Sequence, residues 1–259
     1  MRLGQIRFEN QLTAALFQSG GARPVPGYSM VELIRKAGTE GMAVAALAEQ
    51  MASRHPEPSV PVIPICPVEV WVCEHAQEQG RPQVFFKGTA RVCVGPGRPI
   101  GIRFDSKFTA PGAGLGVLLG PNGSVLGYTL GNDVTARDIE AEGPLYLPQA
   151  KTFTGSCALG PVIVTADEIL DLGRLELACS IRRGGEERFS GSVRLGEIER
   201  SIGHVIEHLL RANKVPAGSV LLIDAGILAP EEAALASGDT VHIVIPQIGE
   251  LANAAVTVQ

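Results

Sequence analysis

Short runs of strand-forming residues, each closed by a turn signal, fill most of this chain. Between residues 68 and 256 they include VEVWV, QVFFKG, PIGIRF, GLGVLLG, GPVIVT, ELACSIRR, SVLLIDAGIL and TVHIVI, separated by Gly, Pro, Asn and Asp. The 31 glycines and 18 prolines, with only 5% aromatic residues, favour turns over long helices. We therefore predict an α+β fold that is mostly β, with a mixed β roll or barrel at its centre.

Helical spacing occurs in two places, one before the β body and one inside it. From Met30 to about Arg54 the apolar residues recur at helical spacing, and residues 196–213 carry a second apolar face. Residues 55–67, HPEPSVPVIPICP, hold five prolines, which force extended backbone and remove amide donors. We predict a small N-terminal α+β domain over residues 1–65 and a main domain over residues 66–259.

The charge balance and the hydropathy pattern exclude several classes of partner. The formal net charge of −5 gives no basic field for nucleic acid or an anionic membrane. No apolar run reaches the roughly 18 residues of a membrane span, and the charged N-terminus is unlike a signal peptide. We expect a cytoplasmic protein with a small-molecule substrate that binds neither nucleic acid nor membrane.

Residues 127–161, GYTLGNDVTARDIEAEGPLYLPQAKTFTGSCALGP, carry the most specific pattern of the chain. They resemble the core motif of the fumarylacetoacetate hydrolase superfamily, and GPLYLPQAK is closest to its sugar-acid dehydratase branch. Further agreement lies in PQVFFKG at 82–88 and SGDTVHIVIPQIGELAN at 237–253, so that the resemblance covers about residues 68–256. It implies the β roll or barrel of that superfamily, in a homodimer or a dimer of dimers.

The resemblance also implies a divalent metal, but this chain departs from the metal-binding pattern. Members of the superfamily hold magnesium or manganese with two glutamates and an aspartate, and the metal chelates the carboxylate and 2-oxo group of the substrate. The aspartate is matched by Asp133, whereas the glutamates fall on Gly112 and Gly114. One carboxylate binds magnesium poorly. We expect no cofactor, with magnesium or manganese bound only if Asp133 and the substrate together complete a site.

Lys151 in PQAKTF matches the superfamily lysine that lies beside the substrate carboxylate or enolate oxygen. Its charge could replace part of the missing metal, and in a desolvated pocket its pKa could fall far enough for proton transfer. The alternative is a structural salt bridge in which Lys151 and Asp133 neutralise each other. The resemblance also places Lys87 and Gln149 at the substrate, so both are predicted to bind it, as is Asp133.

Two further segments bear on the site. His75 and Glu78 match the H-x-x-E spacing with which many members move protons, and the alternative is an exposed helical turn. In IDAGILAP, Ala225 stands where the superfamily has a threonine against the substrate carboxylate, and Asp224 stands beside it. We predict that Asp224 faces the substrate, where its charge would repel an anion.

Asp138 and Glu140 have a structural interpretation. These two carboxylates follow Arg137 within three residues and could serve as substitute metal ligands, but pairing with Arg137 is the favoured interpretation.

The leading functional hypothesis is a diverged, dehydratase-like lyase that acts on a small 2-oxo acid or related polar metabolite without a tightly bound metal. Lys151 would stabilise an enolate, and His75 or Glu78 would move protons. One alternative is a metal-independent tailoring enzyme, such as a cyclase, decarboxylase or C–C hydrolase, which an apolar pocket would favour. The other is a non-catalytic binding subunit, which a direct ion pair between Asp133 and Lys151 would favour.

Overall fold

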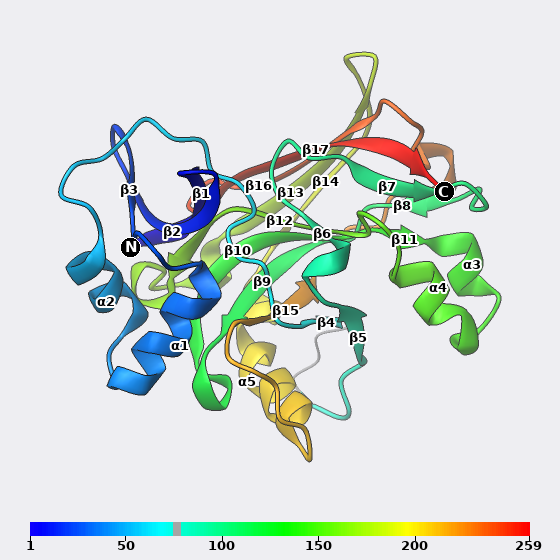
Figure 1. The fold of residues 1–259 in the computed structure, drawn as a ribbon. Coiled ribbons are helices and arrows are strands. Elements are labelled where there is room, and N and C mark those ends of the chain that lie inside the picture. Colours follow the sequence, from blue (N-terminus) through cyan, green and yellow to red (C-terminus); the bar gives the residue numbers. More distant parts are fainter. Residues whose placement is uncertain (75–78) are drawn as a thin grey trace.

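The fold is a large mixed sheet covered on both faces (Figure 1). It was obtained as a computed structural model that describes residues 1–74 and 79–259. The sheet has ten strands, in the order β3 (Gly21–Pro24), β2 (Gln11–Gln18), β1 (Arg2–Phe8), β12 (Cys157–Thr165), β10 (Val125–Asp133), β9 (Ala113–Leu119), β15 (Ser219–Asp224), β4 (Val70–Cys73) and β5 (Val84–Gly88), with β6 (Cys93–Val94) beside β12.

Two smaller sheets complete the β structure. The larger has the order β14 (Glu186–Arg194), β13 (Glu176–Arg183), β16 (Thr240–Ile245), β17 (Gly249–Val258) and β7 (Ile100–Arg103), and the smaller pairs β8 (Thr109–Ala110) with β11 (Thr135–Ala136). The pairs β15–β4, β12–β6 and β17–β7 are parallel and the other pairs are antiparallel. The predicted mostly-β mixed fold is therefore confirmed. Among the described strands, β3 and β5 remain edges, so the sheet does not close into a barrel.

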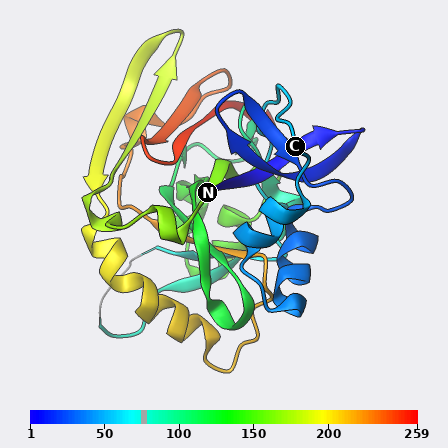
Figure 2. The same ribbon diagram turned by 90° about the vertical axis from the view of Figure 1, so that its left-hand side faces the viewer.

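Helices cover both faces of the large sheet, as Figure 2 shows. Buried side chains of α1 (Met30–Glu40) and α2 (Val44–Met51) pack on one face, and those of α5 (Gly196–Leu210) pack with the five-stranded sheet on the other. Because both faces are covered, β9 is buried at every position, with Leu118 toward α1 and its neighbours Val117 and Leu119 toward the other core.

Local sequence signals explain where the helices begin and end. Ser29 caps α1 in a capping box with Glu32, and Gly41 ends it with a left-handed φ of 66°. The predicted helix over 196–213 is α5, which ends three residues early because Arg211 leaves helical geometry and Ala212 has φ of 54°. None of the helices in the described residues is long and apolar enough to cross a membrane.

The N-terminal strands continue the large sheet, since Leu3 of β1 pairs with Ile163 of β12. The proline-rich segment that follows α2 runs back along these strands, where the Val62 N–H donates to the Gln5 carbonyl at 3.1 Å. The domain boundary near residue 65 stays a prediction.

Candidate active site

Two lysines and one aspartate meet where three elements end. Lys87 lies at the end of β5, Asp133 at the end of β10, and Lys151 at the end of α4 (Leu147–Lys151). All three are buried, with exposed fractions of 0%, 2% and 1%. The Lys87 ammonium lies 2.5 Å from Asp133 Oδ1, and that of Lys151 lies 3.0 Å from Asp133 Oδ2. Each oxygen of the aspartate therefore faces an ammonium group.

The pKa values of the three groups follow from burial and from their mutual charges. Burial opposes the charge of Asp133, but Lys87 and Lys151 outweigh it and hold the pKa of Asp133 below its ordinary value. For Lys87 burial prevails over the attraction of Asp133, so its pKa is lowered, and repulsion from Lys151 adds to the effect. Asp133 is consequently an anion at neutral pH.

Lys151 has the opposite balance because more carboxylates surround it. Burial opposes its charge, but Asp133, Glu140 and Glu74 together raise its pKa above the ordinary value. The lowered pKa considered for Lys151 in the sequence is thus wrong, since the fold adds carboxylates that the motif did not suggest. Lys151 is a permanent cation here, and of the two lysines only Lys87 has a lowered pKa.

Two of the groups around Lys151 were missed by sequence reasoning. The Lys151 ammonium lies 2.5 Å from Glu74 Oε1, and it donates a hydrogen bond to Thr135 Oγ1 at 3.0 Å. Glu74 directly follows β4 and Thr135 directly follows the NDV of the motif. The sequence signal that could have found Glu74 and Thr135 is a polar residue at the end of a predicted strand.

Glu140, which the sequence assigned to a structural pair, also reaches the site. On α3 (Arg137–Ala141), Glu140 Oε2 lies 3.1 Å from Arg137 Nη1 while its Oε1 lies 3.2 Å from Lys151 Nζ. The expected Arg137–Glu140 pair is confirmed. The carboxylate of Asp138 instead accepts hydrogen bonds from Ser106 Oγ and the Lys107 N–H, because it points toward the segment before β8.

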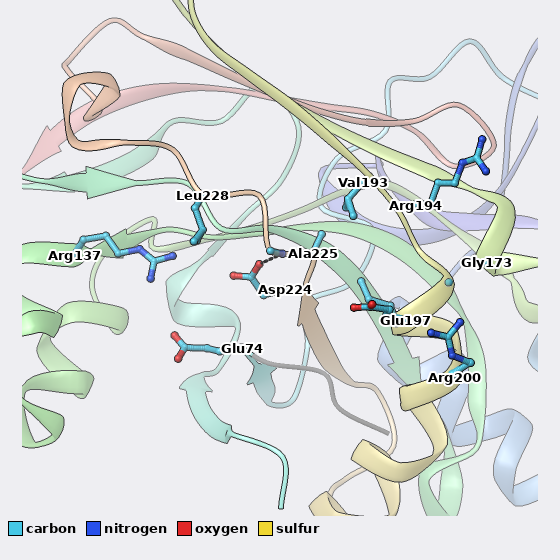
Figure 3. Close-up of a pocket in the computed structure, with 13 residues that line it drawn as sticks. Glu74, Arg137, Gly173, Val193, Arg194, Glu197, Arg200, Asp224, Ala225 and Leu228 are labelled. Atoms are coloured by element: carbon cyan, nitrogen blue, oxygen red, sulfur yellow. Dashed lines mark hydrogen bonds between the residues drawn. The ribbon is translucent and has the colours of Figure 1, made fainter. Parts of the chain in front are cut away.

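A cavity of about 760 Å³ opens beside this cluster (Figure 3). Glu74, Arg137, Asp224 and Ala225 line one end, and the start of α5 lines the other. Figure 3 shows the Glu74 and Asp224 side chains at the same end of the cavity. Burial raises the pKa of Asp224 to about 6, with nearby Asp133 adding to the shift and a hydrogen bond from the Gly226 N–H opposing it.

Gln149 does not belong to the buried cluster. It is exposed on α4, where its backbone carbonyl accepts a hydrogen bond from Arg103 Nη1 at 3.2 Å. His75 and Glu78 lie outside the described residues. Their proton-transfer role, like the substrate-binding role of Gln149, stays a prediction.

The two glycines at the metal-ligand positions stand where no side chain fits. A Cβ atom on Gly112 would lie 2.6 Å from the Asp133 carbonyl oxygen, and one on Gly114 would lie 2.5 Å from that of Ile223. Both distances are far inside van der Waals contact, so the neighbouring backbone has closed over these positions. Within residues 1–74 and 79–259 no three His, Cys, Asp or Glu side chains are grouped to hold a metal ion.

Residues 67–256 match the model of the family described as "Fumarylacetoacetate (FAA) hydrolase C-terminal". The match covers far more than half of the chain, and it includes every residue of the cluster around Asp133. This protein therefore belongs to the fumarylacetoacetate hydrolase family, and the resemblance drawn from the sequence is confirmed.

Two curated relatives are named as dehydratases of sugar acids. The chain is 44% identical to 2-dehydro-3-deoxy-D-arabinonate dehydratase of Saccharolobus solfataricus over 70% of this chain and 60% of that protein. It is 40% identical to a probable 2-keto-3-deoxyxylonate dehydratase of Haloferax volcanii over 69% of this chain and 61% of that protein. The chain thus spans about 60% of the length of these relatives.

A solved structure extends the likeness to the whole fold. The structure described as 2-keto-3-deoxy-D-arabinonate dehydratase complexed with magnesium and 2,5-dioxopentanoate is 31% identical, with a TM-score of 0.85 and full coverage of both chains. The described residues of this chain do not fit a magnesium ion. Both oxygens of Asp133 face ammonium groups, and the two glycines supply no side-chain ligand.

Proposed function

We propose that this protein is a lyase that removes water from a small 2-oxo acid of the sugar-acid type without a tightly bound metal. The activities for which the two curated relatives are named support the reaction class. The observation that carries the metal independence is the pair of ammonium groups on Asp133, with Lys87 2.5 Å from one oxygen and Lys151 3.0 Å from the other. Together the two buried ammonium groups can bring the same charge to Asp133 as one divalent cation.

Lys151 is the group proposed to stabilise the enolate. Removing a proton from C3 of a 2-oxo acid leaves an enolate whose negative charge resides on the C2 oxygen. A fixed cation in a water-poor site stabilises such a developing charge strongly, because no solvent has to reorganise. The raised pKa of Lys151 keeps this group charged throughout, so it acts by electrostatics and not as a proton carrier.

For the substrate to reach Lys151, one of the oxygen atoms that now contact its ammonium group has to move away. An ammonium group has three protons, yet four oxygen atoms lie within 3.2 Å of Lys151 Nζ. Asp133 is fully buried, and Glu140 is also held by Arg137, whereas the Glu74 side chain is 22% exposed and borders the cavity. We propose that the substrate displaces Glu74 and takes its place beside Lys151. His75 and Glu78 remain the proposed carriers of the C3 proton.

One observation favours a second candidate, a non-catalytic binding subunit. The direct ion pair between Lys151 and Asp133 neutralises both groups, as expected for a scaffold that has lost its chemistry. The open cavity beside the pair and the further carboxylates on Lys151 favour the enzyme instead. A tailoring enzyme with an apolar pocket has no such support, because several charged side chains line the cavity.

The test is dehydration of 2-dehydro-3-deoxy-D-arabinonate by the purified protein after exhaustive chelation with EDTA. We expect turnover to persist in EDTA and to fall at least about 100-fold in Lys151→Met, whose unbranched side chain is similar in shape but carries no charge. Activity that vanishes with EDTA and returns with magnesium would overturn metal independence. A wild-type protein that binds the acid without converting it would establish the binding subunit.

A further inference from the structure

Asp224 and Glu74 leave the large sheet side by side. Strands β15 and β4 are parallel, with Ile223 paired to Cys73, so the next residue of each strand emerges at the same edge. That edge is one end of the cavity, and both carboxyl groups line it (Figure 3). The substrate proposed above, seated at Lys151 in place of Glu74, would therefore meet Asp224.

The position of Asp224 depends on Gly114. In the antiparallel pair of β15 and β9, Asp224 lies directly opposite Gly114. A Cβ atom on Gly114 would lie 3.3 Å from Asp224 Cα as well as 2.5 Å from the Ile223 carbonyl oxygen. The glycine thus lets β15 approach β9 closely at the residue pair that includes Asp224.

The surroundings of Asp224 favour its protonated form up to about pH 6, well above the range of an ordinary aspartate. One of its oxygens accepts a hydrogen bond from the Gly226 N–H at 2.6 Å, and the described part of the chain gives it no ion pair. Burial and the Asp133 charge raise its pKa, and Arg137 and Lys151 oppose them. The titratable and charged groups that face it come from every neighbouring element, namely Glu74 after β4, Asp133 on β10, Arg137 on α3, Lys151 on α4 and Cys179 on β13.

We propose that Asp224 is a catalytic general acid that protonates the departing hydroxyl group. This inference rests on the dehydration proposed above. A dehydration of this class needs two proton transfers on different atoms, one from C3 and one to the leaving oxygen. Asp224 would lie beside the enolate bound at Lys151, but it forms no ion pair with Lys151. It is therefore suited to give a proton to the leaving oxygen.

The step balances without a further reactant. Once the C3 proton has left, the electron pair of the enolate forms a double bond between C3 and C4. The C4–O bond breaks with both electrons on the oxygen, and the proton of the Asp224 carboxyl group passes to that oxygen, so that water departs. Asp224 is left as a carboxylate and regains a proton from solvent before the next turnover.

The experiment separates the two proton transfers in 2-dehydro-3-deoxy-D-arabinonate. Exchange of C3 hydrogen for deuterium in D₂O, followed by NMR, reports the first transfer, and release of the dehydrated product reports the second. In Asp224→Asn, which keeps the shape of the side chain, elimination should fall by about 100-fold to 10,000-fold while exchange stays within about threefold of wild type. The exposed Asp167→Asn serves as control and should match wild type in both.

A leaving group that needs no proton provides the decisive variant of the test. On the analogue with fluoride at C4, Asp224→Asn should release fluoride within about threefold of the wild-type rate, because fluoride departs as an anion. A merely structural role would slow both substrates alike. Equal loss of exchange and elimination, or slow fluoride release, would overturn the assignment.

Failure of the proposed function has a different signature. If Lys151→Met were as active as wild type, Lys151 would have no part in the mechanism. The comparison of Asp224→Asn on the two leaving groups would still decide the role of Asp224. Loss of both exchange and elimination in Lys151→Met, with loss of elimination alone in Asp224→Asn, would support both proposals.

Discussion

Gly112 and Asp133 are joined through their backbones at the centre of the site. The Asp133 N–H donates to the Gly112 carbonyl at 2.7 Å, and a Cβ atom on Gly112 would lie 2.6 Å from the Asp133 carbonyl oxygen. The absence of a glutamate at position 112 is therefore more than a shortened side chain, because the backbone has closed into the space that a side chain would need.

Gly112→Ala and Gly114→Ala should each destabilise the protein by about 1–3 kcal/mol, because a methyl group must push backbone atoms apart in a packed core. The measurement is the free energy of unfolding in urea. Gly203→Ala on α5 is the matched control, since a Cβ there meets nothing within 4 Å, and it should be neutral or stabilising by about 0.4–1 kcal/mol. Glycine variants as stable as this control would show that the site has room for side chains.

Asp133→Asn should destabilise the fold by about 3–5 kcal/mol, because it leaves two buried ammonium groups without their shared counter-charge. Adding Lys87→Met should recover part of this loss, since the apolar side chain removes one of the unpaired charges. Urea unfolding of the single and double variants measures the coupling. The exposed pair of Lys36 and Glu40 offers a control, and Glu40→Gln should change stability little. Strictly additive losses would contradict direct coupling of Lys87 and Asp133.

The sequence motif located most of the cluster but not its electrostatics. Asp133, Lys151 and Lys87 each lie in a recognisable family segment, and the resemblance placed all three at the site. The direction of the Lys151 pKa was wrong because it depends on Glu74 and Glu140, which approach from separate elements. Carboxylates that reach a lysine across the fold leave no spacing signal along the chain.

Local signals predicted the elements better than they predicted the edges of the sheet. The break between α1 and α2 near Gly41 follows from the capping of α1, and the helix that begins at Gly196 follows from apolar spacing. Barrel closure depends on which strands pair, and β3 and β5 are left as edges among the described strands. The predicted dimer and the cytoplasmic location remain predictions, because each concerns partners or behaviour beyond a single folded chain. The domain boundary near residue 65 also remains a prediction.

Glu74→Gln should increase the affinity for oxalate, a planar dianion that resembles the enolate of a 2-oxo acid. The carboxylate of Glu74 lies 2.5 Å from Lys151 Nζ, so an entering anion has to compete with it. Neutralising Glu74 should lower the Kd about tenfold, which corresponds to about 1.4 kcal/mol. Calorimetric titration gives the value, and Glu197→Gln, at the other end of the cavity, should change the Kd by less than about twofold. Weaker oxalate binding in Glu74→Gln would mean that Glu74 supports the anion site instead of occupying it.

The contribution of Asp224 to the free energy of unfolding should decrease as pH rises toward neutrality. Its folded pKa of about 6 exceeds the ordinary value of 3.8, so between these values the folded state binds more protons than the unfolded state. The stability that it contributes is fully present below its unfolded pKa and is lost as pH rises through its folded pKa. Asp133 has a lowered pKa and stays ionised across this window, so it does not contribute there.

The comparison is the free energy of unfolding of wild type and Asp224→Asn across this pH window. Between about pH 5 and about pH 7.5, wild type should lose about 1 kcal/mol more than the variant, because asparagine has no proton to release. Because the two proteins share every other titratable group, subtracting one free energy of unfolding from the other removes the contribution of those groups. Parallel stability curves would show that Asp224 is already ionised at pH 5, and a proton donor for the leaving hydroxyl would then have to be sought elsewhere in the cavity.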